Sequence, residues 1–107
     1  MKNLSIGKLR GLQRITSSRG TFTCLALDHR QNLRRSLNPA NSVSVSDAQL
    51  SAFKLEVTKA LADKSTAVLL DPEFSAAQAV AAGAVPNGVG LVVAVESTGY
   101  TGEPTAR

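Results

Sequence analysis

Three short stretches of the 107-residue chain are almost continuously apolar. Continuous apolarity, in contrast to alternation with polar residues, is typical of strands that are covered on both faces in a parallel sheet. The sequence therefore predicts strands at about 21–28, 66–71 and 89–96. The second strand must stop before Pro72, because proline cannot donate to a strand ladder.

The segments between these strands have helical periodicity. In about 3–17, apolar residues recur every three positions, which predicts a short amphipathic helix. Two further short helices are expected at 31–37 and at 74–82. Gly83 follows the latter and is a plausible C-terminal cap, because glycine readily adopts the left-handed conformation that ends many helices.

The clearest helix is predicted at 47–63. Ser46 precedes it and Gln49 follows three residues later, which is the spacing of a capping box. Its apolar side chains predict the face that packs on the rest of the chain. These residues are Leu50, Phe53, Val57 and Leu61.

The order of elements, a helix followed by strand-helix-strand-helix-strand, predicts a fold class. Buried strands that alternate with helices form parallel sheets with right-handed crossover connections. We therefore expect residues 1–107 to form one α/β unit, a (βα)2β arrangement preceded by a short helix. Three strands fit the start of a (β/α)8 barrel or of a doubly wound sheet.

Each predicted strand ends in an acidic residue, namely Asp28, Asp71 and Glu96. The carboxyl ends of parallel strands are where α/β proteins bind their ligands. Crowded carboxylates also shift one another's pKa, which is how such sites obtain a general acid and a general base. The alternative is that each acid caps the helix or loop that follows it.

His29 and Arg30 follow Asp28 directly. A guanidinium at this position could pair with a carboxylate or with a substrate phosphate. The alternatives are a surface ion pair for Arg30 and an ordinary loop histidine for His29.

The single cysteine, Cys24, excludes an intramolecular disulfide. Since it lies inside an apolar run, we expect a buried structural thiol. One cysteine and one histidine cannot supply a tetrahedral metal site, so neither a metal nor a cofactor is expected.

Charge is unevenly distributed. Residues 1–35 carry eight basic side chains against Asp28 alone, whereas the chain as a whole has a net charge of +4. A basic segment can bind nucleic acid, but no aromatic residues alternate with these basic ones, so nucleic-acid binding is not expected. No stretch is long and apolar enough for a signal peptide or a membrane span, which predicts a cytoplasmic protein without membrane contact.

Three segments resemble a known enzyme family. LALDHR (25–30) is similar to the segment that closes the first strand of the tagatose-bisphosphate aldolases, a class I family in which Gln replaces His29. AVLLDPEF (67–74) resembles the end of that family's second strand, and VESTGY (95–100) the segment after its third. The related sulfofructosephosphate aldolases share the first two segments only and are the alternative within the superfamily.

This resemblance implies the N-terminal portion of a TIM barrel, a lyase that cleaves a phosphorylated ketose to dihydroxyacetone phosphate and an aldehyde. The family uses a Schiff-base lysine and no metal. By position, Asp28 and Glu96 would be catalytic, whereas His29, Arg30 and Asp71 would contact the phosphorylated sugar. The Schiff-base lysine belongs to a later strand, so the 107 residues alone are expected to be inactive.

Two further expectations concern Lys54 and the edges of the sheet. Lys54 on the predicted helix 47–63 is expected to form a surface or interface pair, and open strand edges predict association with the missing barrel portion or with a second copy. A small α/β regulatory module of the receiver type is the alternative function. Its pattern requires an acidic pair after the first strand and a phosphate-accepting Asp after the third, where this chain has Asp28 and Glu96.

Overall fold

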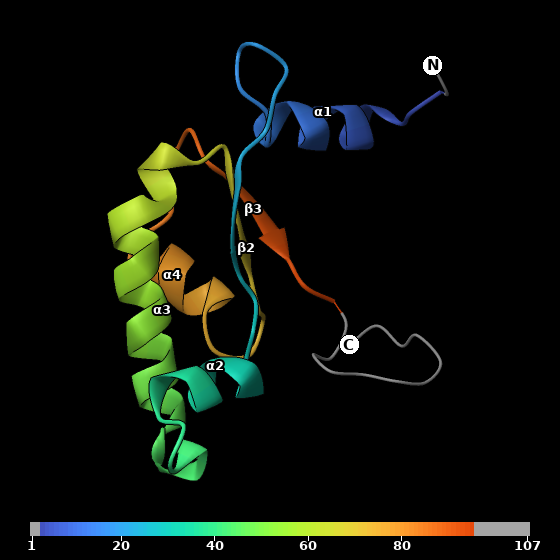
Figure 1. The fold of residues 1–107 in the computed structure, drawn as a ribbon. Coiled ribbons are helices and arrows are strands. Elements are labelled where there is room, and N and C mark those ends of the chain that lie inside the picture. The colour runs from blue at the N-terminus through green and yellow to red at the C-terminus, as the bar shows by residue number, and fades with distance from the viewer. Residues whose placement is uncertain (1–2, 96–107) are drawn as a thin grey trace.

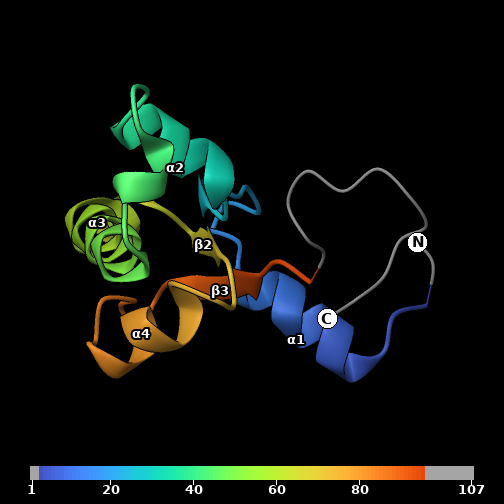
Figure 2. The same ribbon diagram turned by 90° about the horizontal axis from the view of Figure 1, so that it is seen from below.

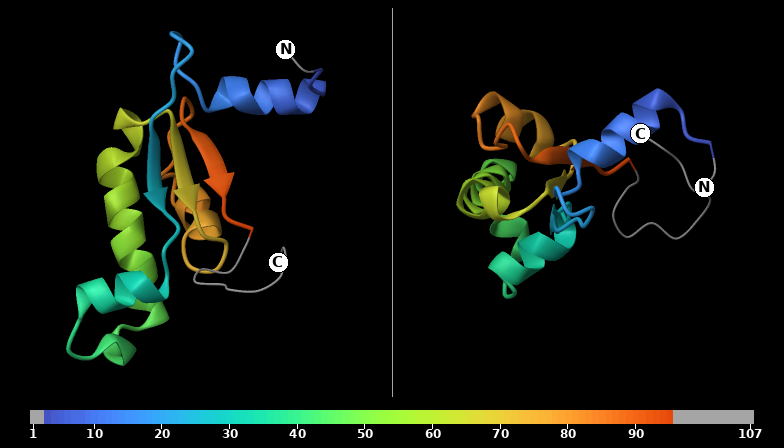
Figure 3. Two further views of the ribbon diagram at one scale, coloured as in Figure 1. Left: turned by 45° about the vertical axis from the view of Figure 1, so that its right-hand side comes forward. Right: turned by 90° about the horizontal axis from the view of Figure 1, so that it is seen from above.

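Three parallel strands lie side by side in chain order in the computed structural model, which describes residues 3–95 (Figures 1 and 3). They are β1 (Cys24–Leu27), β2 (Ala67–Leu70) and β3 (Gly90–Val93). The register aligns their ends, because Leu27 pairs with Leu70 and Leu70 with Val93. The expectation of an α/β chain with a parallel sheet is confirmed, and each strand lies inside the range expected for it.

The helices that connect the strands are α2 (Gln31–Leu37), α3 (Asp47–Leu61) and α4 (Ala76–Ala81). Short 3-10 turns precede and follow α3, at Ser42–Ser44 and Ala62–Lys64. Figure 2 shows α3 and α4 on one side of the sheet, whereas Figure 1 shows α2 near the carboxyl ends of the strands. The described residues therefore form one helical layer on one sheet.

Local sequence signals set the helix ends as expected. The Ser46 hydroxyl accepts from the backbone N–H of Gln49, and the Gln49 side chain accepts from the backbone N–H of Ser46, so the capping box is confirmed. After α4, Gly83 has a φ of 69°, which is the left-handed conformation that glycine adopts without a steric penalty.

The hydrophobic core lies between the sheet and this helical layer. Strand residues Leu27, Val68 and Leu70 pack there against small side chains of the helices and loops. The small residues are Ala62, Ala76, Ala79 and Ala84, joined by Val89. Because alanines form much of the helical side, α4 can pack closely on the sheet.

The opposite face of the sheet is open at β1 within residues 3–95, whereas Ala67 of β2 and Gly90 of β3 are buried on it. Cys24 and Ala26 of β1 are exposed there, and Leu69 and Val92 are half-buried. The expectation that Cys24 is a buried thiol is therefore wrong for this structure. The apolar composition of β1 shows a strand suited to burial on both faces, but the described residues cover one of them.

Helix α1 (Ile6–Arg14) lies at the other end of the sheet, near the amino ends of the strands (Figure 1). Ser5 caps its start with a hydroxyl that accepts from the backbone N–H of Lys8, and the helix buries none of its residues. The chain just after it reaches β3 closely. A Cβ atom at Gly90 would lie 2.6 Å from Cγ2 of Ile15, so this contact requires glycine.

The buried face of α3 differs from the predicted apolar stripe. Leu50, Lys54 and Thr58 are fully buried, four residues apart on one face. Phe53 and Leu61, which the pattern assigned to the buried face, are 37% and 45% exposed. The helix is therefore rotated from the expected orientation, and a lysine lies where an apolar residue was expected.

Candidate functional site

Polar side chains gather at the carboxyl edge of the sheet. Asp28, His29 and Arg30 follow β1, and Asp71 and Glu73 follow β2. Aligned parallel strands bring these two segments to the same edge. Asp28 is half-buried there and His29 is exposed. Glu96, the expected third acid, lies outside the described residues.

A buried ion pair joins α3 to the end of β2. The Lys54 ammonium donates to Oδ1 of Asp71, and neither side chain has any exposed surface. The expectation of a surface or interface pair for Lys54 is therefore wrong. An ion that is removed from water costs several kcal/mol unless a partner and hydrogen bonds compensate it, which explains why the two residues occur together.

Asp71 also closes the turn that follows β2. Its Oδ2 accepts from the backbone N–H of Phe74 at 2.6 Å, and its Oδ1 accepts from the Ser75 hydroxyl at 2.6 Å. Its backbone carbonyl accepts from the N–H of Ala76 at 2.9 Å. Both carboxylate oxygens of Asp71 are thus engaged inside the chain, in the capping role that was the alternative interpretation of this acid.

These contacts decide the protonation state of Asp71. Burial acts to raise the pKa of its carboxyl group, but the hydrogen bonds from Lys54, Ser75 and Phe74, together with the charge of Lys54, hold that pKa below its ordinary value. The carboxylate is therefore the ionised partner of a buried ammonium at neutral pH.

The same turn carries Glu73 to Arg30. Nη1 of Arg30 lies 2.5 Å from Oε1 of Glu73, and the side chains are 6% and 39% exposed. The predicted substrate-binding arginine is thus a nearly buried cation held by a partly exposed carboxylate. Charge-assisted pairs of this kind are among the stronger hydrogen bonds in proteins.

A second arginine, Arg34, contacts Phe74 in the turn after β2 and two residues near the start of α3. The Arg34 guanidinium donates to the carbonyl of Val45 and to Oδ1 of Asp47, and its Cζ lies 5.4 Å from the centre of the Phe74 ring. A guanidinium at this distance from a ring is attracted by the electrons of its face. Arg34 therefore ties α2 to the start of α3 and to the turn after β2.

Sequence reasoning missed Lys54, Glu73 and Arg34 as members of this edge. Glu73 had a signal, because it lies two residues after the strand-ending Asp71. Arg34 had a weaker one, because it lies four residues after Arg30, a spacing that brings side chains close together where a chain turns helically. Lys54 had none, since nothing in a helical pattern distinguishes a buried lysine from a surface one.

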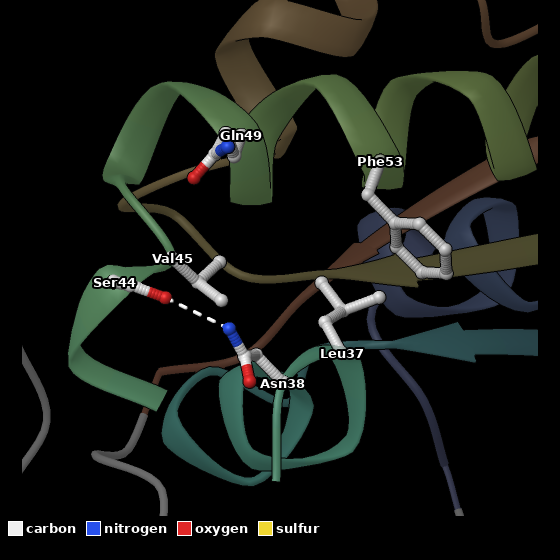
Figure 4. A pocket seen from close by; sticks show the side chains of 6 residues that line it. All are labelled: Leu37, Asn38, Ser44, Val45, Gln49 and Phe53. Atoms are coloured by element: carbon white, nitrogen blue, oxygen red, sulfur yellow. Dashed lines mark hydrogen bonds between the residues drawn. The ribbon is translucent and has the colours of Figure 1, made fainter. Parts of the chain in front are cut away.

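Next to this network, α2, α3 and the segment between them line an open hollow of about 330 Å³. Figure 4 shows Leu37, Val45 and Phe53 around it, with Asn38 donating to the Ser44 hydroxyl at 2.9 Å beside them. Gln49 completes the lining. None of the predicted site residues contributes to this hollow.

Neither a metal site nor a membrane-spanning helix is found in the part of the chain that the structure describes. Among residues 3–95, no group of three or more His, Cys, Asp or Glu side chains could hold a metal ion. Helices within that range are too short or too polar to cross a membrane.

The geometry defines an α/β chain with a cation-carboxylate network at the carboxyl edge of its sheet, and known proteins resemble it along its length. The chain is 36% identical over all 107 residues to tagatose 1,6-diphosphate aldolase 2 of Enterococcus faecalis. It is 32% identical over 100 residues to tagatose 1,6-diphosphate aldolase of Listeria monocytogenes, and 30% identical over 93 residues to that of Staphylococcus epidermidis. No family model matches the chain.

The resemblance to the tagatose-bisphosphate aldolases is thereby confirmed, and the chain is a homologue of these proteins. It spans less than a third of their length, 31% of the Enterococcus protein and 28% of the Listeria and Staphylococcus proteins.

Proposed function

We propose that the chain is the N-terminal (βα)2β portion of a TIM barrel, residues 1–107 forming a partial aldolase domain. The whole protein cleaves a phosphorylated ketose to dihydroxyacetone phosphate and an aldehyde. The observation that carries this proposal is the 36% identity over the full 107 residues to an aldolase more than three times as long. The three parallel strands with helices on one face support it, because a barrel also has its helices outside the sheet.

In this proposal the covalent chemistry belongs to a lysine on a later strand. An unprotonated amine attacks the substrate ketone, and the ketone oxygen leaves as water to give an iminium, which accepts the electrons of the carbon-carbon bond that breaks. Lys54 is not a candidate for that step, since its amine is fully buried and donates to Asp71. The 107 residues alone are therefore expected to be inactive.

The residues at the carboxyl edge would serve the same reaction. Asp28 is half-buried beside the site and would move a proton, with Glu96 as a second catalytic carboxylate. His29 and Arg30 would contact the phosphorylated sugar. Asp71 would serve the substrate through the turn that it anchors, because its two oxygens already accept hydrogen bonds within the chain.

We further propose that the chain associates with the rest of the barrel, or with a second copy where that part is missing. Two features support this. The sheet face that carries Cys24 and Ala26 is exposed at these two residues of β1, and β1 and β3 each pair on one side only in the described sheet. An unpaired edge offers hydrogen-bonding groups to another strand.

We also propose a cytoplasmic location for the protein, without membrane or nucleic-acid contact.

Borohydride trapping tests the chemistry. The 107-residue chain, of mass 11.2 kDa, is incubated with dihydroxyacetone phosphate and sodium borohydride, and its intact mass is measured. We expect no adduct. A reduced adduct on this chain would place the Schiff-base lysine within residues 1–107 and would contradict its assignment to a later strand.

A chimera tests the site. The matching third of the Enterococcus faecalis aldolase is replaced by this chain, and we expect the product to form the adduct and to cleave tagatose 1,6-bisphosphate. Asp28→Asn in the chimera should lower the cleavage rate by roughly 100-fold or more, the usual contribution of a positioned acid or base. Asp63→Asn, on an exposed residue, is the matched control. Equal rates for these two variants would remove Asp28 from the catalytic group.

A further inference from the structure

The turn after β2 places the carboxylate of Glu73 on the guanidinium of Arg30, the more deeply buried of the two arginines at the candidate site. Arg30 is 6% exposed at its side chain and Glu73 is 39% exposed, so the carboxylate lies on the solvent side of the pair. An anion that approaches Arg30 from solvent therefore meets Glu73 first. Either the anion replaces the carboxylate, or it binds without the full charge of the arginine.

The position of Glu73 is fixed by the fold. Asp71 and Ser75 bracket the residue, and Asp71 holds the backbone N–H of Phe74 at 2.6 Å and that of Ala76 at 2.9 Å. The buried ammonium of Lys54 in turn fixes Asp71. A carboxylate held by such a turn returns to the same place after displacement, so it acts as a built-in competitor and not as a passing surface contact.

We propose that Glu73 sets the affinity of this site for anions, by occupying Arg30 in the free protein and giving way to a phosphate group of the substrate. The choice of phosphate rests on the proposed function, whereas the competition itself rests on the Arg30–Glu73 geometry. Glu73 is a specificity residue in this account. A doubly charged phosphate displaces Glu73. A neutral or singly charged hydroxylated compound does not, because its attraction to Arg30 is weaker than that of the Glu73 carboxylate.

The test uses the 107-residue chain with inorganic phosphate as the probe, at fixed pH and low ionic strength. Glu73→Gln keeps the size of the side chain but removes its charge, so the contact between Arg30 and residue 73 becomes a contact with a neutral amide. We expect the dissociation constant for phosphate to fall by about tenfold or more, the equivalent of one charge-assisted hydrogen bond. Titration calorimetry or the phosphorus chemical shift reports it.

Two further variants make the result specific. Glu56→Gln removes a charge from an exposed position of α3 and should leave the dissociation constant unchanged, which separates the competition from a general change of net charge. Glu73→Gln combined with Arg30→Met should lose the gain. Phosphate binding that is equal in the parent chain and in Glu73→Gln, or undetectable in both, overturns the proposal, and so does a gain that persists without Arg30.

This experiment is independent of the aldolase chemistry. Phosphate binding needs no Schiff-base lysine, so the tenfold gain can occur even if the chimera fails to cleave its substrate. In that case the aldolase assignment falls and the competition at Arg30 stands. The reverse outcome, an active chimera without the gain in Glu73→Gln, removes Glu73 from the site and leaves the aldolase assignment intact.

Discussion

The ammonium of Lys54 donates to Oδ1 of Asp71 across 17 residues of sequence, in a part of the core that solvent does not reach. The pair joins the middle of α3 to Asp71, the residue after β2 that begins the turn carrying Glu73. It therefore connects the packing of the helix with the geometry of the candidate site.

Replacement of the ammonium should destabilise the chain strongly. Lys54→Met keeps the length and apolar stem of the side chain but leaves the carboxylate of Asp71 buried without its cation. Removal of one partner of a buried pair typically costs about 3–5 kcal/mol. We expect the free energy of unfolding, measured in urea, to fall by about that amount.

Two controls accompany this measurement. Lys59→Met, on an exposed position of the same helix, should change the free energy of unfolding by less than about 0.5 kcal/mol. Adding Asp71→Asn to Lys54→Met should restore part of the loss, because a neutral amide can still accept from the N–H of Phe74. Additive losses in the double variant would contradict a direct pair.

The stability of the chain should depend on pH through Asp71. Its pKa in the folded chain lies below the ordinary value of 3.8, because hydrogen bonds and the charge of Lys54 outweigh burial. The ionised carboxylate therefore binds protons less readily when folded than when unfolded. Its stabilisation is fully present above about pH 4 and is lost as the pH falls through the lowered pKa.

Unfolding experiments between pH 6 and pH 2 test this dependence. The parent chain should lose stability steeply below about pH 4, whereas Asp71→Asn should start lower at pH 6 and change less below pH 4. Asp63→Asn, at an exposed position, should keep the steep loss of the parent. The same slope in all three chains would show that Asp71 does not cause the acid response.

Gly90 should resist substitution because of its contact with the end of α1. A Cβ atom there would lie 2.6 Å from Cγ2 of Ile15 and 2.9 Å from the carbonyl oxygen of Arg14. Gly90→Ala should therefore cost about 1–3 kcal/mol of stability, the usual range for overpacking. Amide hydrogen exchange should also show faster exchange in α1.

Gly88→Ala is the matched control, since a Cβ atom at Gly88 would meet nothing within 4 Å. It should be neutral or slightly stabilising, because alanine restricts the unfolded chain more than glycine does. If both substitutions have the same effect, the contact between Gly90 and Ile15 does not hold α1 on the sheet.

Cys24 reports on the uncovered face of the sheet. Its thiol is exposed within the described residues, so a thiol reagent should label it in the native chain without prior unfolding. If copies of the chain associate through this face, as proposed above, the labelling rate should fall as the protein concentration rises into the micromolar range. Labelling in denaturant, where the sheet is unfolded and Cys24 is fully accessible, provides the reference rate.

A labelling rate that is independent of concentration, together with a monodisperse monomer in analytical ultracentrifugation, would rule out self-association through this face. Slow labelling at every concentration would have a different meaning. It would show that Cys24 is covered within a single chain, contrary to its exposure in the structure.

Much of the architecture is set locally, and the sequence by itself determined it. Apolar runs mark β1, β2 and β3, since a buried strand needs apolar side chains on both sides. Two helix-end signals act within a few residues, so the sequence alone predicts them. They are the capping box at Ser46 and Gln49 and the glycine after α4. The position of Asp28 and Asp71 at one edge also follows from the strand order, because parallel strands end together.

Only the tertiary structure decided which side chains are buried and with which partners. Periodicity assigned Phe53 to the core face of α3, but Lys54 lies there, since a carboxylate 17 residues further along the chain compensates its charge. Likewise, apolar neighbours predicted a buried Cys24, although burial depends on a second layer that residues 3–95 do not supply. Burial and ion pairing are properties of segments brought together by the fold, so a local pattern does not contain them.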